Sequence, residues 1–207
     1  MWLKGKVMKA HYNGLIPRNP FIQLHISPNV KEREYLTEDE LKAVMTHEFA
    51  DSKLAYIRDI FIFASFTVLS FVDIQELTND NIVEVNGEKW ILSKRHKTKV
   101  AFQVKLLDIP LQIVERYRPM QKDNRIFPGL NYWSICKPLK RMIRECGITK
   151  SISFHCSRHG FATLALSKGM PIESVSRVLG HTNIVTTQLY AKITTQKLGN
   201  DLTAFGN

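Results

Sequence analysis

Four groups of side chains in this 207-residue chain have the types and spacing needed to act on a phosphate ester. His155 and Arg158 stand three residues apart at a predicted helix start, so they share one helix face. His181 follows a Leu-Gly helix stop, and Tyr190 comes nine residues later. Lys97 lies in a turn rich in positive charge between two predicted strands. Together these groups could bind an anion, move a proton and supply a nucleophile.

Each residue type contributes a different part of a phosphodiester reaction. Arg158 can grip a phosphate through a planar fork of donors, and the two histidines can donate hydrogen bonds or move protons near neutral pH. Lys97 can protonate a leaving alkoxide, and Tyr190 can attack phosphorus to form a covalent phosphotyrosyl intermediate. Acidic residues are nearly absent around these motifs, so the sequence offers no paired-carboxylate metal site and predicts neither a metal nor a cofactor.

Taken singly, each of these residues has an ordinary structural explanation. A lone histidine in a helix is usually a packed or surface residue, and a buried tyrosine usually packs. A turn of Lys and Arg is usually solvated. The joint spacing of these residues favours a reactive site over separate structural roles.

The surrounding pattern predicts the elements that must position these groups. Thr37 and Glu40 form a capping box at a helix start, and Asn86-Gly87 predicts a hairpin between two strands. Helices are expected over about 37–49, 53–71, from Pro110 onward, and over 132–146, 153–168, 171–179 and 183–193. Strands are expected at 82–85, 89–93 and 100–106. Residues 1–34 contain helix breakers and are expected to lack a long element. This order predicts a mainly α-helical α+β domain with a small three-stranded antiparallel sheet.

Charge is distributed unevenly along the chain. Lys and Arg number 29 against 19 Asp and Glu, a net charge of +10. Residues 89–207 hold twenty basic and six acidic side chains, and residues 1–30 hold four and none. Such an excess points to a polyanion: nucleic acid, an anionic membrane or an acidic protein. No apolar run reaches the roughly 20 residues that span a bilayer, and the three cysteines form no CxxC pair.

Several segments resemble the tyrosine recombinases, the phage integrase family. Residues 155–162 resemble the family's His-x-x-Arg-His segment, 179–181 its Leu-Gly-His segment, and 186–191 the segment that carries its nucleophile. The first capping box, the Asn-Gly hairpin and the Lys97-Thr98 turn fall in the family's order. The resemblance covers about residues 20–195. The residues of these motifs most resemble those of integrases of Bacteroidetes mobile elements.

The resemblance implies a tyrosine recombinase catalytic-domain fold and a site-specific DNA recombinase, an integrase of a mobile element. In such enzymes the tyrosine, here Tyr190, takes the 3′ end of a cut strand and frees a 5′-hydroxyl that attacks a partner strand. Arg158, His155, His181 and Lys97 match further catalytic positions. The implied partners are double-stranded DNA, a homo-tetramer on that DNA with a monomer in its absence, and accessory DNA-bending proteins. No cofactor, metal or membrane is implied, and a cytoplasmic, nucleoid-associated location is expected.

One catalytic position departs from the family. Its first arginine belongs to a Gly-Leu-Arg segment that reads Val68-Leu69-Ser70 here, and a serine offers no charged bidentate fork. Either the enzyme is crippled or another cation fills the space. Arg95, two residues before Lys97, is the candidate, because i and i+2 point the same way in an extended segment. Arg95 could instead contact the DNA backbone outside the active centre.

The remaining basic residues and the domain limits are also expectations. The predicted DNA-binding residues are Lys94, Lys99, Lys140, Arg141 and Arg144. Residues 35–207 are expected to form the catalytic domain, and 1–34 a linker with the end of a core-binding domain. The tail, 194–207, could pack in cis or on a neighbouring protomer.

Three alternatives stay open at this point. The chain could be a DNA-binding relative without strand transfer, because Ser70 stands where the family has a catalytic arginine. A type IB topoisomerase-like activity uses the same chemistry, and a partner other than nucleic acid could take the basic surface. An adduct between Tyr190 and nicked DNA discriminates among them.

Overall fold

The computed structural model describes residues 2–22, 34–96, 99–121, 123–181 and 183–191, with 199, 202 and 203. Two compact units make up the chain, Met1–Glu32 and Arg33–Asn207. No helix of the described residues is long and apolar enough to cross a membrane.

The first unit contains helix α1, Trp2–Tyr12. The expectation that residues 1–34 lack a long element is therefore wrong for their first part. The breakers lie after the helix rather than in it: Gly14, with φ 71°, donates its N–H to the carbonyl of His11 and ends the helix. None of the α1 side chains is buried.

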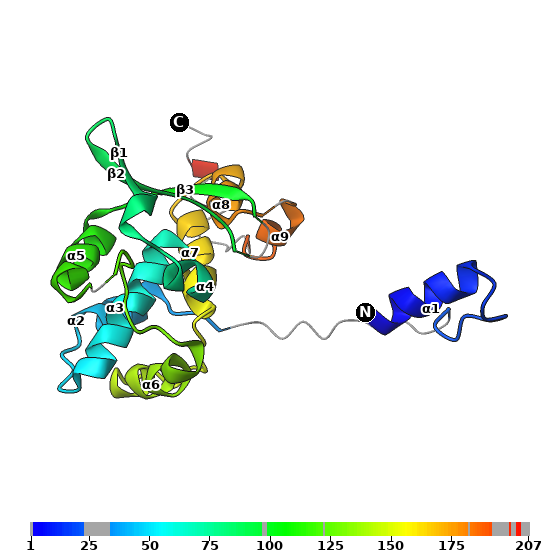
Figure 1. Ribbon diagram of the computed structural model, residues 1–207, viewed down its shortest axis with the longest axis horizontal. Helices are drawn as coiled ribbons and strands as arrows, with labels where there is room; N and C mark the ends of the chain where they lie inside the picture. The colour runs from blue at the N-terminus through cyan, green and yellow to red at the C-terminus, as the bar shows by residue number, and fades with distance from the viewer. Residues whose placement is uncertain are drawn as a thin grey trace. The chain divides into compact units, whose positions relative to one another are not determined.

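The second unit is mainly helical with one small sheet (Figure 1). Its α-helices are α2 (Glu38–Thr46), α3 (Ser52–Thr67), α4 (Phe71–Gln75), α5 (Asp108–Tyr117), α6 (Tyr132–Glu145), α7 (Cys156–Ser167), α8 (Ile172–Leu179) and α9 (Val185–Gln188). Two 3-10 turns occupy Asn79–Asn81 and Arg118–Met120. Strands β1 (Ile82–Val85), β2 (Glu88–Lys94) and β3 (Ala101–Lys105) form an antiparallel sheet in that order. The predicted fold class is confirmed.

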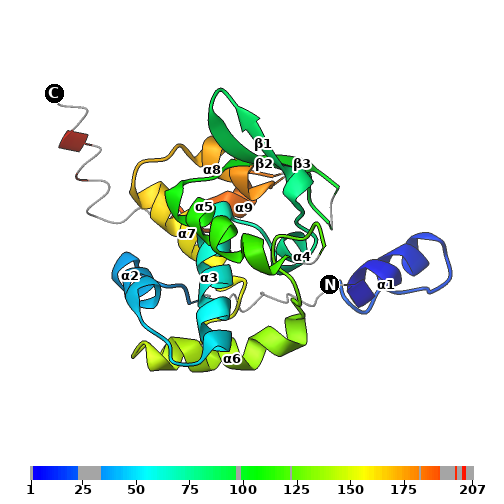
Figure 2. The same cartoon turned by 60° about the vertical axis from the view of Figure 1, so that its left-hand side comes forward.

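Helix α3 is the centre of the core. It contacts α2, α5, α6 and α7, and it runs among these helices in both views (Figures 1 and 2). Most of its side chains are buried, including Ile60, Phe61 and Phe63. A helix that is apolar on most of its circumference must be covered on several sides. Helices α2, α5, α6 and α7 therefore pack around α3 and cover it.

The sheet is set by its hairpin. Asn86 and Gly87 both have positive φ, 53° and 78°, as a two-residue hairpin turn requires, and they place Val85 opposite Glu88. Strand β2 continues beside β3 to the pair Lys94 and Ala101. The predicted hairpin is confirmed, and each end of the three predicted strands agrees with the structure to within one residue.

Several predicted helices are shorter than expected, including the first, which ends at Thr46 rather than near Phe49. The capping box of Thr37 and Glu40 is confirmed, but the helix predicted over 53–71 ends at Thr67. There Val68 takes a left-handed conformation with φ 61°. The helix predicted over 183–193 spans only Val185–Gln188, so Tyr190 lies in the turn after α9. Helical periodicity alone does not reveal such breaks, because the apolar spacing continues across them.

A buried carboxylate joins α3 to α5. Asp59 is 3% exposed and accepts hydrogen bonds from Arg58 Nε (2.9 Å), Arg116 Nη1 (2.6 Å) and Tyr117 Oη (2.8 Å). Burial and the Asp59 carboxylate raise the pKa of Tyr117, so its hydroxyl stays protonated and donates. The network ties the last turn of α5 to the central helix.

Replacing this carboxylate is expected to destabilise the domain. Asp59→Asn puts an amide NH2 among three donors, so the free energy of unfolding should fall by about 2 to 3 kcal/mol. Urea unfolding followed by circular dichroism measures this change. Glu84→Gln, at an exposed position on β1, is the control and should change stability by less than about 0.5 kcal/mol. Equal effects of the two variants would contradict the assignment.

Candidate active site

The break between α3 and α4 presents a carbonyl group. Val68 is fully buried, and its left-handed backbone is uncommon for a β-branched residue. The chain turns there, and Ser70 then caps α4, its Oγ accepting from the N–H of Asp73. The carbonyl oxygen of Val68 is thereby free of the helix ladder and available to side chains from other elements.

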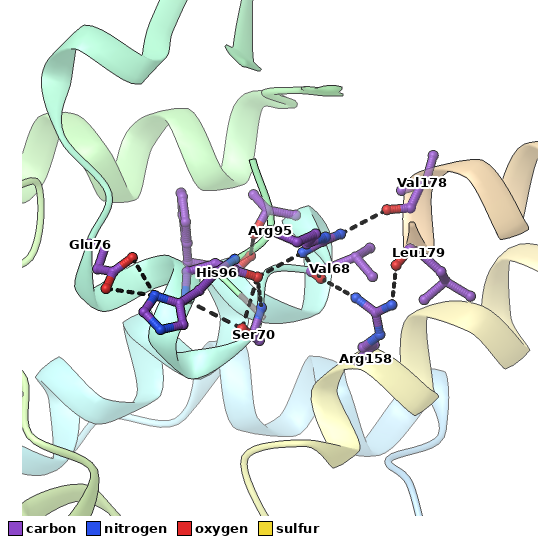
Figure 3. A network of polar contacts seen from close by, with 11 residues as sticks. Val68, Ser70, Glu76, Arg95, His96, Arg158, Val178 and Leu179 are labelled. Atoms are coloured by element: carbon purple, nitrogen blue, oxygen red, sulfur yellow. Dashed lines mark hydrogen bonds and ion pairs between the residues drawn. The ribbon is translucent and has the colours of Figure 1, made fainter. Parts of the chain in front are cut away.

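Two arginines from distant parts of the chain meet on this carbonyl (Figure 3). Arg95, just after β2, donates from Nη1 to the Val68 oxygen at 3.2 Å, and Arg158, on α7, donates from Nη1 at 3.0 Å. Each also reaches the end of α8: Arg95 Nη2 donates to the carbonyl of Val178 at 2.9 Å, and Arg158 Nη2 to that of Leu179. Helix C-terminal carbonyls carry partial negative charge and favour cations.

Asp73 holds the Arg95 side of this arrangement. Its carboxylate accepts from Arg95 Nη1 at 3.0 Å, from the backbone N–H of His96 at 2.9 Å and from Ser70 Oγ at 2.8 Å. Burial acts to raise the pKa of Asp73, but the hydrogen bonds from His96, Ser70 and Arg95 outweigh it and lower the pKa. Asp73 is therefore a carboxylate at neutral pH. His96 is further paired with Glu76 through Nδ1 at 2.8 Å (Figure 3).

The two guanidiniums carry more positive charge than their surroundings balance. Among the described residues, Asp73 is the one carboxylate that hydrogen-bonds to either of them. Burial and the charge of Arg95 lower the pKa of Arg158 to about 10, and Tyr190 and Asp73 act in the opposite direction. Because buried charges need partners, this excess favours binding of an anion.

Tyr190 lies beside two histidine rings, one of which contacts a third. Its ring centroid is 5.1 Å from that of His159 and 6.4 Å from that of His181. The ring planes of Tyr190 and His181 are nearly parallel. The ring of His159 in turn lies 4.7 Å from that of His155. Tyr190 also packs against a small apolar cluster that includes Val68. The predicted nucleophile is thus held beside the predicted histidines.

His181 is neutral in this arrangement. Burial, followed by the positive charges of Arg158 and Arg95 and by His155, lowers the pKa of His181 to about 4. Its Nδ1 lies 2.9 Å from the hydroxyl of Thr187. With Thr187 as the donor, the proton of the imidazole is on Nε2 and can be donated to a ligand.

A cavity of about 260 Å³ opens beside Ser70. His155 and Arg158 line it from α7, and Phe71 and Tyr132 line it from α4 and α6. Arg95 reaches the shared carbonyl from the side of Asp73. Position 70 therefore lies at a cavity whose lining includes Arg158 but not Arg95.

Not all of the predicted site residues come together. Lys97 lies outside the described residues. Lys94 and Lys99 are exposed on either side of Arg95, whose carbonyl accepts the N–H of Lys99 at 2.8 Å. The predicted DNA-binding residues of α6 stand apart from this turn, since the sheet and α6 lie at opposite ends of the domain (Figures 1 and 2).

Helix α6 carries a separate basic groove of about 420 Å³. Its lining residues are Lys137, Lys140, Arg141, Arg144 and Glu145. Arg141 is paired with Glu145 at 2.8 Å and with Asp51 at 3.3 Å. The groove therefore offers three cations not engaged in this pairing, along one helix face.

The sequence analysis did not single out Asp73, His159 or Phe102 as residues of the site. The Ser-x-x-Asp pattern at Ser70 and Asp73 is a capping-box signal that could have shown the helix break. His159 stands inside the motif quoted for His155 and Arg158. Phe102 lies under Arg95, and nothing in the sequence marks it beyond the alternation of its strand. Within the described part of the chain, no three His, Cys, Asp or Glu side chains are grouped to hold a metal ion.

The chain was compared with known proteins. Residues 34–197 match the sequence pattern of the phage integrase family. Tyrosine recombinase XerA of Pyrococcus horikoshii is 32% identical over 177 residues, which are 79% of this chain and 58% of that protein. The chain thus spans less than three fifths of the length of this relative.

Solved structures show the same fold. The Tn1549 transposon integrase in complex with circular intermediate DNA aligns with a TM-score of 0.78 at 17% identity, over 97% of this chain and 75% of that one. The XerH site-specific recombinase, in a post-cleavage complex with its palindromic difH substrate, aligns with a TM-score of 0.68 at 21% identity, over 89% and 56%. The matched region includes every described residue of the site, and the chain belongs to the phage integrase family.

Proposed function

We propose that this chain is the catalytic part of a site-specific DNA recombinase that breaks and rejoins strands through Tyr190. The observation that carries the proposal is the meeting of Arg95 and Arg158 on one carbonyl beside Tyr190, with one carboxylate as counter-charge. A phosphodiester supplies the missing negative charge. The relatives named XerA and XerH support the same reaction class.

The reaction assigns a role to each group. The Tyr190 oxygen attacks the scissile phosphorus, the bond from phosphorus to the 5′ oxygen breaks, and a 3′-phosphotyrosyl bond forms. The phenol proton passes to a nearby imidazole, and Lys97 gives a proton to the departing 5′ oxygen. Arg158 and His181 bind the non-bridging oxygens, where charge increases in the transition state. Attack by a 5′-hydroxyl of a partner strand reverses these steps and needs no cofactor.

In this proposal Arg95 replaces the family's first catalytic arginine, which is absent at position 70. Its contact with Asp73, which also binds Ser70, supports this role, as does its sharing of the Val68 carbonyl with Arg158. A single cationic donor at a developing phosphorane contributes about 3 kcal/mol. This is enough to favour a replacement over an empty position.

The DNA contacts extend beyond the cut phosphate. Lys94 and Lys99 flank Arg95 and would bind neighbouring phosphates. Lys140, Arg141 and Arg144 on α6 would hold the duplex farther along. Residues 35–207 form the catalytic domain in this proposal, and 1–34 connect it to a core-binding domain. A homo-tetramer would assemble on paired recombination sites on the nucleoid, helped by DNA-bending proteins.

A non-cutting DNA-binding relative is the second candidate. Ser70 favours it, because the α4 cap carries no cation. The arrangement of Tyr190 among the histidines has no evident use in such a protein.

Removal of the nucleophile separates the two candidates. On a suicide substrate with a nick next to the cut site, the 207-residue chain is expected to form a covalent adduct visible on denaturing gels. Tyr190→Phe removes the attacking oxygen and should abolish the adduct, whereas Tyr35→Phe, at an exposed position, should not. An adduct that persists in Tyr190→Phe places the nucleophile elsewhere.

Removal of the second cation tests the role of Arg95. Arg95→Ala is expected to slow single-turnover cleavage by about 10²- to 10³-fold, as the loss of one transition-state donor does. Thermal unfolding checks that the variant is folded. The control is Arg118→Ala, which removes an exposed arginine away from the site and should keep the wild-type rate. A folded Arg95→Ala protein that cleaves normally would exclude Arg95 from the reaction.

The charge on His181 is expected to respond to DNA. Without DNA its imidazole should titrate with a pKa of about 4 in NMR spectra of the histidine nitrogens. A phosphate beside Arg158 offsets the cations that lower this pKa, so the pKa should rise in the complex. The complex then holds more protons than the free protein, and the Kd for DNA should fall as the pH drops from 7 to 5.

The comparison variant for this titration is Arg158→Ala. It removes the positive charge with the largest effect on His181, so the pKa of DNA-free His181 should increase toward 6.5, although burial still lowers it. A wild-type His181 that titrates near 6.5 would contradict both the burial of its ring and the effect of the two arginines on it.

A further inference from the structure

Arg95 lies in a slot formed by Phe102 and Gly180. The guanidinium carbon is 4.1 Å from the centroid of the Phe102 ring, which belongs to β3 and is 6% exposed. A Cβ atom added to Gly180 would stand 3.3 Å from Arg95 Nε and 3.7 Å from its Cγ. Gly180 also has φ 65°, as the left-handed end of α8 requires. We call these two residues the Phe102–Gly180 slot.

The slot limits where the guanidinium can lie. Arg95 is 7% exposed, and its Nη atoms are bound to Asp73, Val68 and Val178. Its Nε has no hydrogen-bond partner among the residues that the structure describes. The face of an aromatic ring attracts a cation, most strongly where water is excluded. An aliphatic side chain would fill the same volume without this attraction.

We infer that Phe102 is a positioning residue, whose ring holds the Arg95 guanidinium beside Arg158 so that both face one phosphate. This inference rests on the proposed role of Arg95. The ring of Phe102 would allow Arg95, which follows β2, to replace an arginine at position 70, the N-cap of α4. The ring supplies a face for the cation, and Gly180 leaves room for its stem.

Phe102 is also part of the apolar core, so its structural and positioning roles must be separated. Val104 is the natural comparison. It lies two residues along β3, is likewise 6% exposed, and belongs to the same core cluster. A loss of packing at either position weakens the domain, but Phe102 is the one of the two that offers a ring face to Arg95.

The pKa of His181 reports where Arg95 is, because the Arg95 charge is one of the causes that lower it. In the DNA-free protein, Phe102→Leu should let the guanidinium leave the slot, and the pKa of His181 should rise as it does in Arg95→Ala. Phe102→Tyr keeps a ring face and should keep the wild-type pKa. Val104→Ala should lower the melting temperature and leave this pKa in place.

Two further outcomes complete the test. The double variant Arg95→Ala with Phe102→Leu should show the same His181 pKa as Arg95→Ala alone, since one cation cannot be lost twice. At saturating DNA, Phe102→Leu should slow cleavage by up to about a hundredfold, the effect of a small misplacement, and Phe102→Tyr should recover most of the rate. Phe102→Met replaces Phe102→Leu if the leucine variant does not fold.

The inference is overturned if Phe102→Leu keeps the wild-type His181 pKa while Arg95→Ala raises it. It is also overturned if Phe102→Tyr behaves like Phe102→Leu, or if Val104→Ala moves the pKa as much. The titrations need no cleavage. Absence of a Tyr190 adduct would therefore overturn the proposed function and leave the test of Phe102 intact.

Discussion

The carboxylate of Asp73 is the interaction on which the rest of the site depends. It accepts hydrogen bonds from the start of its own short helix, through Ser70, and from the end of β2, through Arg95 and His96. One side chain thereby joins the helical core to the sheet. Without it the hydrogen bonds of Arg95 would be only those to the carbonyls of Val68 and Val178, and the backbone N–H of His96 would lose its partner.

The site stores positive charge at the ends of helices. Carbonyl groups of Val68, Val178 and Leu179 hold the two guanidiniums without neutralising them. Burial, together with these charges, keeps His181 in its neutral form. An oxygen ligand that bears a full negative charge gains from every one of these groups at once, whereas a neutral ligand gains only hydrogen bonds. The arrangement therefore favours an anionic ligand over a neutral ligand of the same shape.

Much of this could be predicted from local sequence. The capping box at Thr37, the Asn86-Gly87 hairpin and the glycine helix ends are short-range signals, and the structure confirms them. The order of elements was enough for the fold class. The spacing of His155, Arg158 and His181 was enough to group residues that the folded chain brings together.

The remainder depends on contacts between distant segments. The turn at Val68 presents its carbonyl to two arginines that lie 27 and 90 residues later. Ser70 and Asp73 mark a helix start there, but no local pattern tells which side chains meet on this carbonyl. The position of Phe102 beneath Arg95 depends on how the sheet lies against α8. The short α9 likewise leaves Tyr190 in a turn, although its sequence continues with helical spacing.

The hairpin has a consequence for how such a chain can change. Because successive strand residues face opposite sides, a shift of one residue in β2 would turn Arg95 away from Asp73 and expose Phe102 if it moved β3 with it. The exposed Asn86-Gly87 tip looks like a place where insertions are harmless. An inserted residue that stays in the loop leaves the pairing of Val85 with Glu88 in place, whereas one that enters the β2 ladder reverses the facing of the strand that leads to Arg95. Tolerance at this tip therefore depends on where an added residue is accommodated, in the loop or in the ladder.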